Sequence, residues 1–190
     1  HCTADGAGLA FAGLFFGQGK DATRWQARAW SILCDEIPRQ VYPDGVDFEA
    51  SIPYHRLVAE LFLLPALYRE ALGPDVPEPY RERVKAMARF TMAYSRPDGS
   101  VPLWGDADDA RVLPFGPQAI GDHRYLPALV EACLGGTPAI DGPRAEIAWV
   151  IGPEAAAGLP GATPPPTRLF AGGGVAVLRG GGDHVFVDCG

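Results

Sequence analysis

The sequence predicts a mainly α-helical fold, part of an (α/α) toroid built of helical hairpins, followed by the first strands of an antiparallel β-sandwich. Apolar residues recur at helical spacing in successive pairs of segments, and long polar loops separate the pairs. After residue 152, short alternating segments stand between glycine turns. We therefore expect a toroid portion over residues 1–154, a linker over 155–166, and the truncated start of a β-sandwich domain over 167–190.

The first predicted hairpin joins a helix over residues 4–17 to a second helix over 22–37. The first helix is apolar along most of its length, which is typical of a mostly buried helix. In the second helix, Trp25, Ala29 and Leu33 recur on one face, which indicates an amphipathic helix. We expect this helix to end at Pro38, because proline cannot donate a helical hydrogen bond.

Two further helical pairs follow. A strong helix over residues 53–72 begins with proline, which is favoured in a first turn because its missing N–H has no helical partner there. Its partner helix is expected over 80–94. The other expected elements are helices over about 122–134 and 144–151 and strands over 167–170, 174–179 and 184–188.

Composition and charge narrow the function classes. The hydrophobic fraction of 47% and the charged fraction of 21% are those of an ordinary globular protein. The net charge of −7 argues against binding nucleic acid through a broad basic surface. The longest apolar runs are too short to span a membrane. The sequence thus favours neither a nucleic-acid partner nor a membrane span.

Both ends of the sequence read as cuts. The chain opens at His1 without an initiator methionine or a secretory leader, and it stops just after an expected strand. We therefore expect an internal fragment of a longer protein. The 4 cysteines are scattered and form no Cys-x-x-Cys pair, so buried free thiols are expected rather than zinc ligands.

Two polar segments carry most of the chemistry. The first polar stretch, residues 44–56, places Glu49, Ser51, Tyr54, His55 and Arg56 at the start of a helix. The second polar stretch, residues 96–109, contains an aromatic residue and several carboxylates. Loops held by rigid helices are a frequent location of catalytic groups. Two polar, aromatic loops on a helical scaffold indicate a carbohydrate site.

The order of these motifs resembles the heparinase II/III-like family. The motifs are Asp-Gly-Val-Asp-Phe-Glu-Ala-Ser-Ile-Pro-Tyr-His (44–55), Pro-Asp-Gly-Ser-Val-Pro-Leu-Trp-Gly-Asp (97–106) and the glycine-rich entry to the strands. The resemblance spans essentially the whole chain and implies an (α/α) toroid joined to a β-sandwich. It also implies a polysaccharide lyase that acts on an acidic, uronic-acid-containing polymer in the periplasm or outside the cell.

The resemblance also assigns residues. It makes Tyr54 the catalytic acid or base, and it makes His1 the second member of an Asn-His pair that contacts the substrate carboxylate. It places the catalytic histidine, and any zinc ligands, in the β domain beyond residue 190. No cofactor or metal is therefore expected in this chain, and the fragment alone is expected to be inactive.

The lyase reaction explains the other candidate residues. Removing the C5 proton of a uronate spreads negative charge onto its carboxylate, which a cationic or hydrogen-bonding group must stabilise. His55 and Arg56 are the local candidates for this, and Glu49, Asp106 and Trp104 are expected to contact the sugar. Tyr54 and His55 also fit a plain capping and packing pair, and Trp104 also fits a plug of the toroid.

Two other functions stay open on the residues alone. One is an inverting glycoside hydrolase, whose two carboxylates stand about 6.5–9.5 Å apart, with Glu49 and Asp106 as the candidate pair. The other is a non-catalytic glycan-binding protein. The cluster Asp106, Asp108 and Asp109 is interpreted as ordering its loop without a metal, and His123 and His184 as structural.

Overall fold

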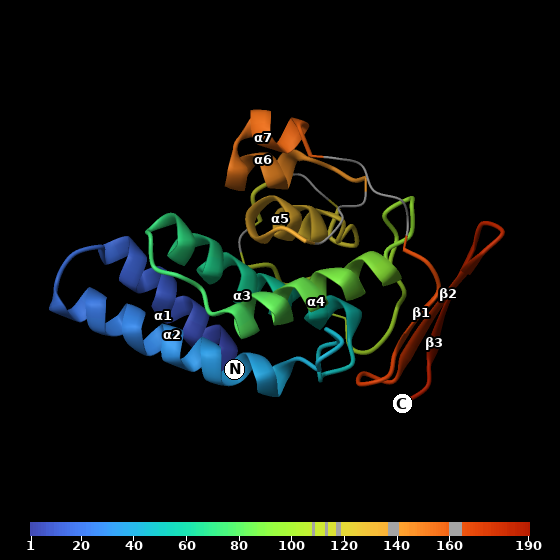
Figure 1. The fold of residues 1–190 in the computed structure, drawn as a ribbon, viewed down its shortest axis with the longest axis horizontal. Helices are drawn as coiled ribbons and strands as arrows, with labels where there is room; N and C mark the ends of the chain where they lie inside the picture. The colour runs from blue at the N-terminus through green and yellow to red at the C-terminus, as the bar shows by residue number, and fades with distance from the viewer. Residues whose placement is uncertain (108, 113, 117–118, 137–140, 160–164) are drawn as a thin grey trace.

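The structure, a computed structural model, describes residues 1–190 except 108, 113, 117–118, 137–140 and 160–164. It is mainly helical with one small antiparallel sheet (Figure 1). This confirms a mainly helical part followed by antiparallel strands. A closed toroid and a complete sandwich stay predictions. No helix within the described residues is long and apolar enough to cross a membrane.

The first hairpin pairs α1 (Cys2–Phe16) with α2 (Lys20–Gln40), which lie side by side in Figure 1. The predicted end of α2 at Pro38 is wrong, because the helix continues to Gln40. Proline removes its own N–H from the ladder, but the helix continues, and the N–H of the C-cap residue Val41 still donates to Ile37 O at 3.1 Å.

The second hairpin pairs α3 (Ile52–Ala71) with α4 (Glu78–Tyr94), both close to prediction. Shorter helices follow: α5 (Tyr125–Leu134), α6 (Ala145–Ile151) and α7 (Pro153–Ala157). The helix α7 crosses the predicted start of the linker at residue 155. Its proline at the first position and its alanines favour helix, although the surrounding Ala-Gly-Pro composition suggested a linker.

The sheet contains β1 (Arg168–Phe170), β2 (Val175–Gly180) and β3 (Asp183–Asp188) in the order β1-β2-β3. It packs on the helical part through a shared core. Phe170, Val175 and Val177 from the sheet are buried with Ile52 of α3 and Phe90 of α4. The start of α3 is therefore enclosed by helices and sheet together.

The four cysteines are free thiols, but the expectation that all are buried is wrong. Cys2 and Cys189 are exposed, whereas Cys34 and Cys133 are half-buried.

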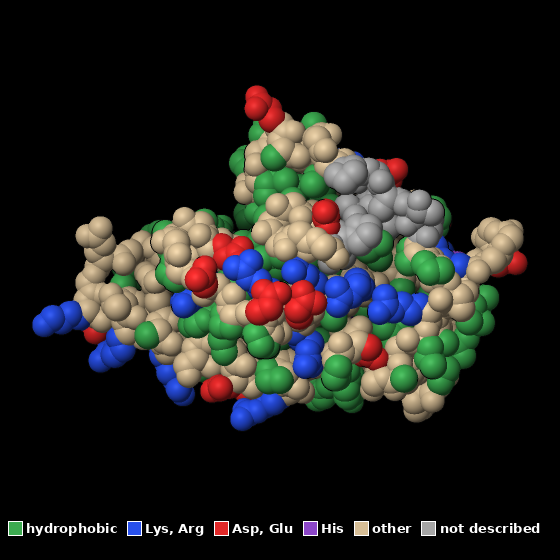
Figure 2. Space-filling view, in the orientation of Figure 1, with side chains coloured by type: hydrophobic (Ala, Val, Ile, Leu, Met, Phe, Trp, Pro, Cys, Tyr) green, Lys and Arg blue, Asp and Glu red, His purple; other side chains and the backbone are tan. Residues whose placement is uncertain are grey.

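Basic side chains form an interrupted row across the face shown in Figure 2, with acidic side chains beside them. Two ion pairs involve basic residues of α4. Arg81 lies 2.5 Å from Glu70, and Lys85 lies 3.0 Å from Glu82. Such neighbouring opposite charges reduce the attraction of this face for a polyanion.

Candidate active site

The first polar stretch folds into a tight loop before α3, and backbone hydrogen bonds hold this loop in place. Val41 and Asp47 form an isolated antiparallel bridge, and Tyr42 N–H donates to Val46 O at 2.9 Å. Gly45 has φ 98°, and a Cβ atom there would stand 2.1 Å from Ala86 O on α4. Only glycine fits this close approach, so the loop is fixed against α4.

The last residues of this loop are strained and capped. Ala50 has φ 52°, a left-handed conformation that alanine rarely adopts and that costs on the order of 1–3 kcal/mol. Ser51 is the N-cap of α3, and its Oγ accepts the Tyr54 N–H at 3.2 Å. Such strain persists only where the surrounding structure enforces it, and it is frequent at functional sites.

The two polar stretches meet at this point. Ser51 Oγ donates to Asp106 O at 2.7 Å, and Ile52 N–H donates to Trp104 O at 3.0 Å. Gly105 lies so close that a Cβ atom there would be 2.4 Å from Ala50 O. The second polar stretch therefore supplies acceptors that the start of α3 needs.

Tyr54 lies in the first turn of α3 with a half-buried side chain. Its two successors are different, since His55 and Arg56 are 0% and 1% exposed. The segment thus leaves Tyr54 half-buried and places an imidazole and a guanidinium inside the protein.

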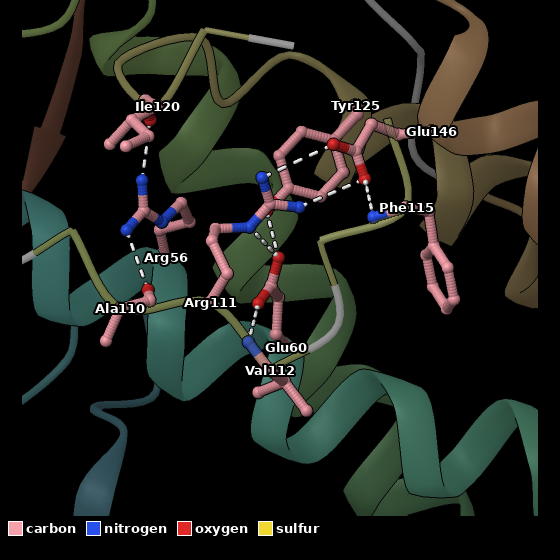
Figure 3. Close-up of polar contacts among 9 residues, drawn as sticks. All are labelled: Arg56, Glu60, Ala110, Arg111, Val112, Phe115, Ile120, Tyr125 and Glu146. Carbon is pink, nitrogen blue, oxygen red and sulfur yellow. Dashed lines mark hydrogen bonds and ion pairs between the residues drawn. The ribbon is translucent and has the colours of Figure 1, made fainter. Parts of the chain in front are cut away.

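The burial of His55 and Arg56 does not support their predicted direct contact with substrate. His55 Nε2 lies 3.2 Å from Met87 O and 3.1 Å from Thr91 Oγ1 on α4. Because a carbonyl only accepts, Nε2 carries the proton. Arg56 donates to Ile120 O at 2.6 Å and to Ala110 O at 2.8 Å (Figure 3).

A neutral cluster of buried polar groups extends from His55 across α4 and is formed by His55, Thr91, Tyr94 and His123. Tyr94 OH lies 2.9 Å from His123 Nδ1 and 3.4 Å from Thr91 Oγ1. Burial lowers the pKa of His55 to about 4. Burial, reinforced by the Arg56 charge, lowers the pKa of His123 to about 3. Both histidines are therefore uncharged at neutral pH.

An ionic cluster lies farther along α3 and is formed by Glu60, Arg111, Tyr125 and Glu146 (Figure 3). Arg111 lies 2.6 Å from Glu60 and 3.1 Å from Glu146, and its guanidinium carbon lies 4.6 Å from the centre of the Tyr125 ring. Tyr125 OH donates to Glu60. The cluster thereby fixes Arg111 and Val112 to α3, and Arg111 to α6.

Sequence reasoning missed both clusters, although it correctly interpreted His123 as structural. A signal was present for the ionic cluster. Glu60 interrupts an otherwise apolar part of α3, and Glu146 interrupts a short apolar helix. A carboxylate at such a position is rarely buried without a partner. The partners stand 35–65 residues away in the sequence, so they could not be named.

Asp47 and Glu49, two carboxylates of the first polar stretch, differ sharply in burial. Asp47 is 1% exposed, and its carboxyl oxygens lie near the backbone N–H groups of Phe48 and Glu49 without well-formed hydrogen bonds to them. Burial, reinforced by the nearby charge of Glu49, raises the pKa of Asp47 to about 7. Glu49 itself is exposed. Asp47 was not selected from the sequence, because nothing in its neighbours indicated burial.

The remaining candidate residues differ in exposure and in the groups that they contact. The side chain of Asp106 is exposed, and only its carbonyl contacts Ser51. Trp104 is half-buried and contacts the sheet through Asp188. His1 is exposed at the start of α1, and Asp108 lies outside the described residues. His184 donates from Nε2 to Ala93 O at 3.0 Å, a contact that links β3 to α4.

Comparison with known proteins places this geometry in a family. The Heparinase II/III N-terminus family model matches residues 1–114. The chain is 36% identical over 99 residues to a heparin-sulfate lyase from Pedobacter heparinus, a match that covers 51% of this chain and 15% of that protein. It is 29% identical over 109 residues to a heparin-sulfate lyase from Bacteroides stercoris, covering 56% of this chain and 16% of that protein.

A solved structure shows the same fold over most of the chain. It is a heparan sulfate lyase mutant from Pedobacter heparinus, with a TM-score of 0.63 and 25% sequence identity. The likeness covers 93% of this chain and 25% of that one. The chain spans only a small part of the relatives it matches. Because the family model covers more than half of the sequence, the chain belongs to the Heparinase II/III N-terminus family.

Proposed function

We propose that the full-length protein cleaves a uronic-acid-containing polysaccharide by β-elimination, with Tyr54 as the acid or base. The observation that carries the proposal is the placement of Tyr54. Its half-buried phenol stands in the first turn of α3, and its backbone N–H is held by the capping Ser51. The relatives named as heparin-sulfate lyases support the same reaction class.

The proposed reaction needs proton transfer at two atoms. The base takes the C5 proton, and the electron pair of the C5–H bond forms the C4–C5 double bond. The C4–O bond breaks, its electron pair stays on the leaving oxygen, and that oxygen takes a proton from the acid. A phenol positioned on one side of the sugar ring is suited to these steps. General acid–base help of this kind contributes roughly 10²–10⁴-fold.

The negative charge that develops on the substrate carboxylate needs stabilisation. The N-terminus of α3 beside Tyr54 offers only its dipole for this, because Trp104 O and Ser51 Oγ already accept the Ile52 and Tyr54 N–H groups. We assign His55 and Arg56 a positioning role, since both are buried. The exposed Glu49, Asp106 and His1 remain proposed substrate contacts. An acidic polysaccharide outside the cytoplasm remains the proposed partner.

The test uses the full-length protein against a panel of uronate polymers, with ultraviolet absorbance of the unsaturated product as the signal. Tyr54→Phe is expected to lower the rate by roughly 10²–10⁴-fold. Tyr68→Phe is the matched control, because Tyr68 is a half-exposed tyrosine on the same helix. Equal rates in the two variants would contradict the role of Tyr54.

The glycoside hydrolase alternative rests on the exposed pair Glu49 and Asp106. Asp47 has a pKa suited to a general acid, but its burial keeps it from a substrate. A hydrolase releases reducing ends without ultraviolet absorbance.

The second alternative is a glycan-binding protein. Binding that survives Tyr54→Phe, with no cleavage by the unaltered protein, would identify it.

A further inference from the structure

Trp104 is joined to the sheet by its side chain. Its Nε1–H donates to Asp188 Oδ2 on β3 at 3.2 Å, and its ring centre lies 5.2 Å from that of Phe186. The other carboxyl oxygen of Asp188 accepts Gly190 N–H at 3.2 Å, which orients the carboxylate. The indole is thus held by two neighbouring side chains of one strand.

The backbone of the same residue is joined to the start of α3. The Trp104 carbonyl accepts Ile52 N–H at 3.0 Å, one of the helix N–H groups that lack a helical partner. The next residues continue this contact, since Asp106 O accepts the hydroxyl of Ser51 at 2.7 Å. Ser51 in turn accepts Tyr54 N–H. A continuous set of contacts therefore runs from β3 to the turn that carries Tyr54.

We infer that Trp104 is a positioning residue that fixes the Tyr54 turn to β3, and that Asp188 orients Trp104 for this role. The inference rests on the proposed function of Tyr54. It separates the two sequence-based interpretations of Trp104, a sugar-stacking platform and a packing residue, because a stacking platform would not require Asp188. A small displacement of a reacting group lowers the rate markedly, so loss of this link acts on the chemical step.

The variants remove the link from either side. Trp104→Phe keeps an aromatic ring beside Phe186 but loses the N–H donor. Asp188→Leu loses the acceptor, whereas Asp188→Asn keeps an acceptor oxygen. Trp149→Phe is the matched control for the first variant, because Trp149 on α6 is 72% exposed. Asp183→Leu, at the other end of β3, is the matched control for the second.

In the full-length protein, Trp104→Phe and Asp188→Leu are each expected to lower kcat by about 3–10-fold, the effect of one hydrogen bond. KM should stay within about twofold, because the substrate contacts remain. The two substitutions remove the same hydrogen bond, so their effects should not add. The double variant should therefore be no slower than the slower single variant. Asp188→Asn has one acceptor oxygen for two N–H donors, so it should recover only part of the rate. A rise in KM for Trp104→Phe, with Asp188→Leu unchanged, would overturn the inference in favour of sugar stacking.

Hydrogen exchange gives a readout that does not depend on activity. Trp104→Phe and Asp188→Leu should speed amide exchange over residues 51–56 and leave α5 unchanged, because local opening is expected rather than global unfolding. Unchanged exchange over 51–56 in both variants would overturn the inference even if the protein proves to be a lyase. If the unaltered protein has no lyase activity but both variants still exchange faster over residues 51–56, the positioning role of Trp104 stands. Only the proposed function would then be rejected.

Discussion

The neutral cluster and the ionic cluster both hold the first half of α3, and they use opposite electrostatics. His55 of the neutral cluster is bound to α4 by an uncharged imidazole. Glu60 of the ionic cluster is bound to Arg111 by opposite charges. The neutral cluster avoids burying a charge, whereas the ionic cluster depends on keeping its charges matched. The two should therefore fail under different perturbations.

The largest effect should follow from breaking the ionic cluster. Arg111→Met leaves two carboxylates, of Glu60 and Glu146, buried without their cation. Breaking a buried pair in this way costs about 3–5 kcal/mol of the free energy of unfolding. Arg24→Met is the control, because the Arg24–Asp21 pair is exposed and should be worth less than about 1 kcal/mol. Urea unfolding curves that match for both variants would contradict the account.

An intermediate effect should follow from acid, which acts on the neutral cluster. Between about pH 4 and 6.5 the unfolded chain protonates His55 and His123, while the folded chain does not. These groups therefore add stability above pH 6.5 that is lost as the pH falls. Asp47 acts oppositely, since the folded chain holds its proton up to about pH 7.

More histidines than aspartates shift in this window, so the free energy of unfolding should rise with pH, by about 1.4 kcal/mol per pH unit for each proton that the unfolded chain binds in excess. His184, whose pKa is lowered mainly by burial, acts in the same direction. Unfolding curves at several pH values measure the slope. Asp47→Asn should steepen it by removing the opposing group. A slope that is flat, or negative, would show that the buried histidines do not titrate as described.

The smallest effect should follow from removing one hydroxyl of the neutral cluster. Tyr94→Phe leaves His123 Nδ1 without its 2.9 Å partner, which should cost about 1–3 kcal/mol of the free energy of unfolding. Thermal unfolding of the variant beside Tyr68→Phe, a half-exposed tyrosine, provides the measurement. A loss no greater than that of the control would remove Tyr94 from the cluster.

Local sequence patterns predicted the elements better than the contacts between them. Helix α3 was expected over 53–72 and spans Ile52–Ala71, because its apolar pattern and its proline are local signals. The end of α2 at Pro38 and the start of the linker at residue 155 were predicted from proline and glycine nearby. In both places the helical preference of the other residues extends the helix past the predicted boundary.

The candidate site was predicted only in its local part. The polar stretch around Tyr54 was visible in the sequence, but the inward orientation of His55 and Arg56 was not. That orientation depends on Thr91 and Ile120, which are distant in the sequence. The burial of Asp47 depends likewise on how the whole loop packs.

The most direct test of the account is the mass of the products that the full-length protein releases from a uronate polymer. Elimination gives a fragment one water lighter than hydrolysis of the same bond. The account predicts this lighter fragment from the unaltered protein and its loss in Tyr54→Phe. Fragments carrying the added water, or the lighter fragment formed at an unchanged rate by Tyr54→Phe, would contradict it.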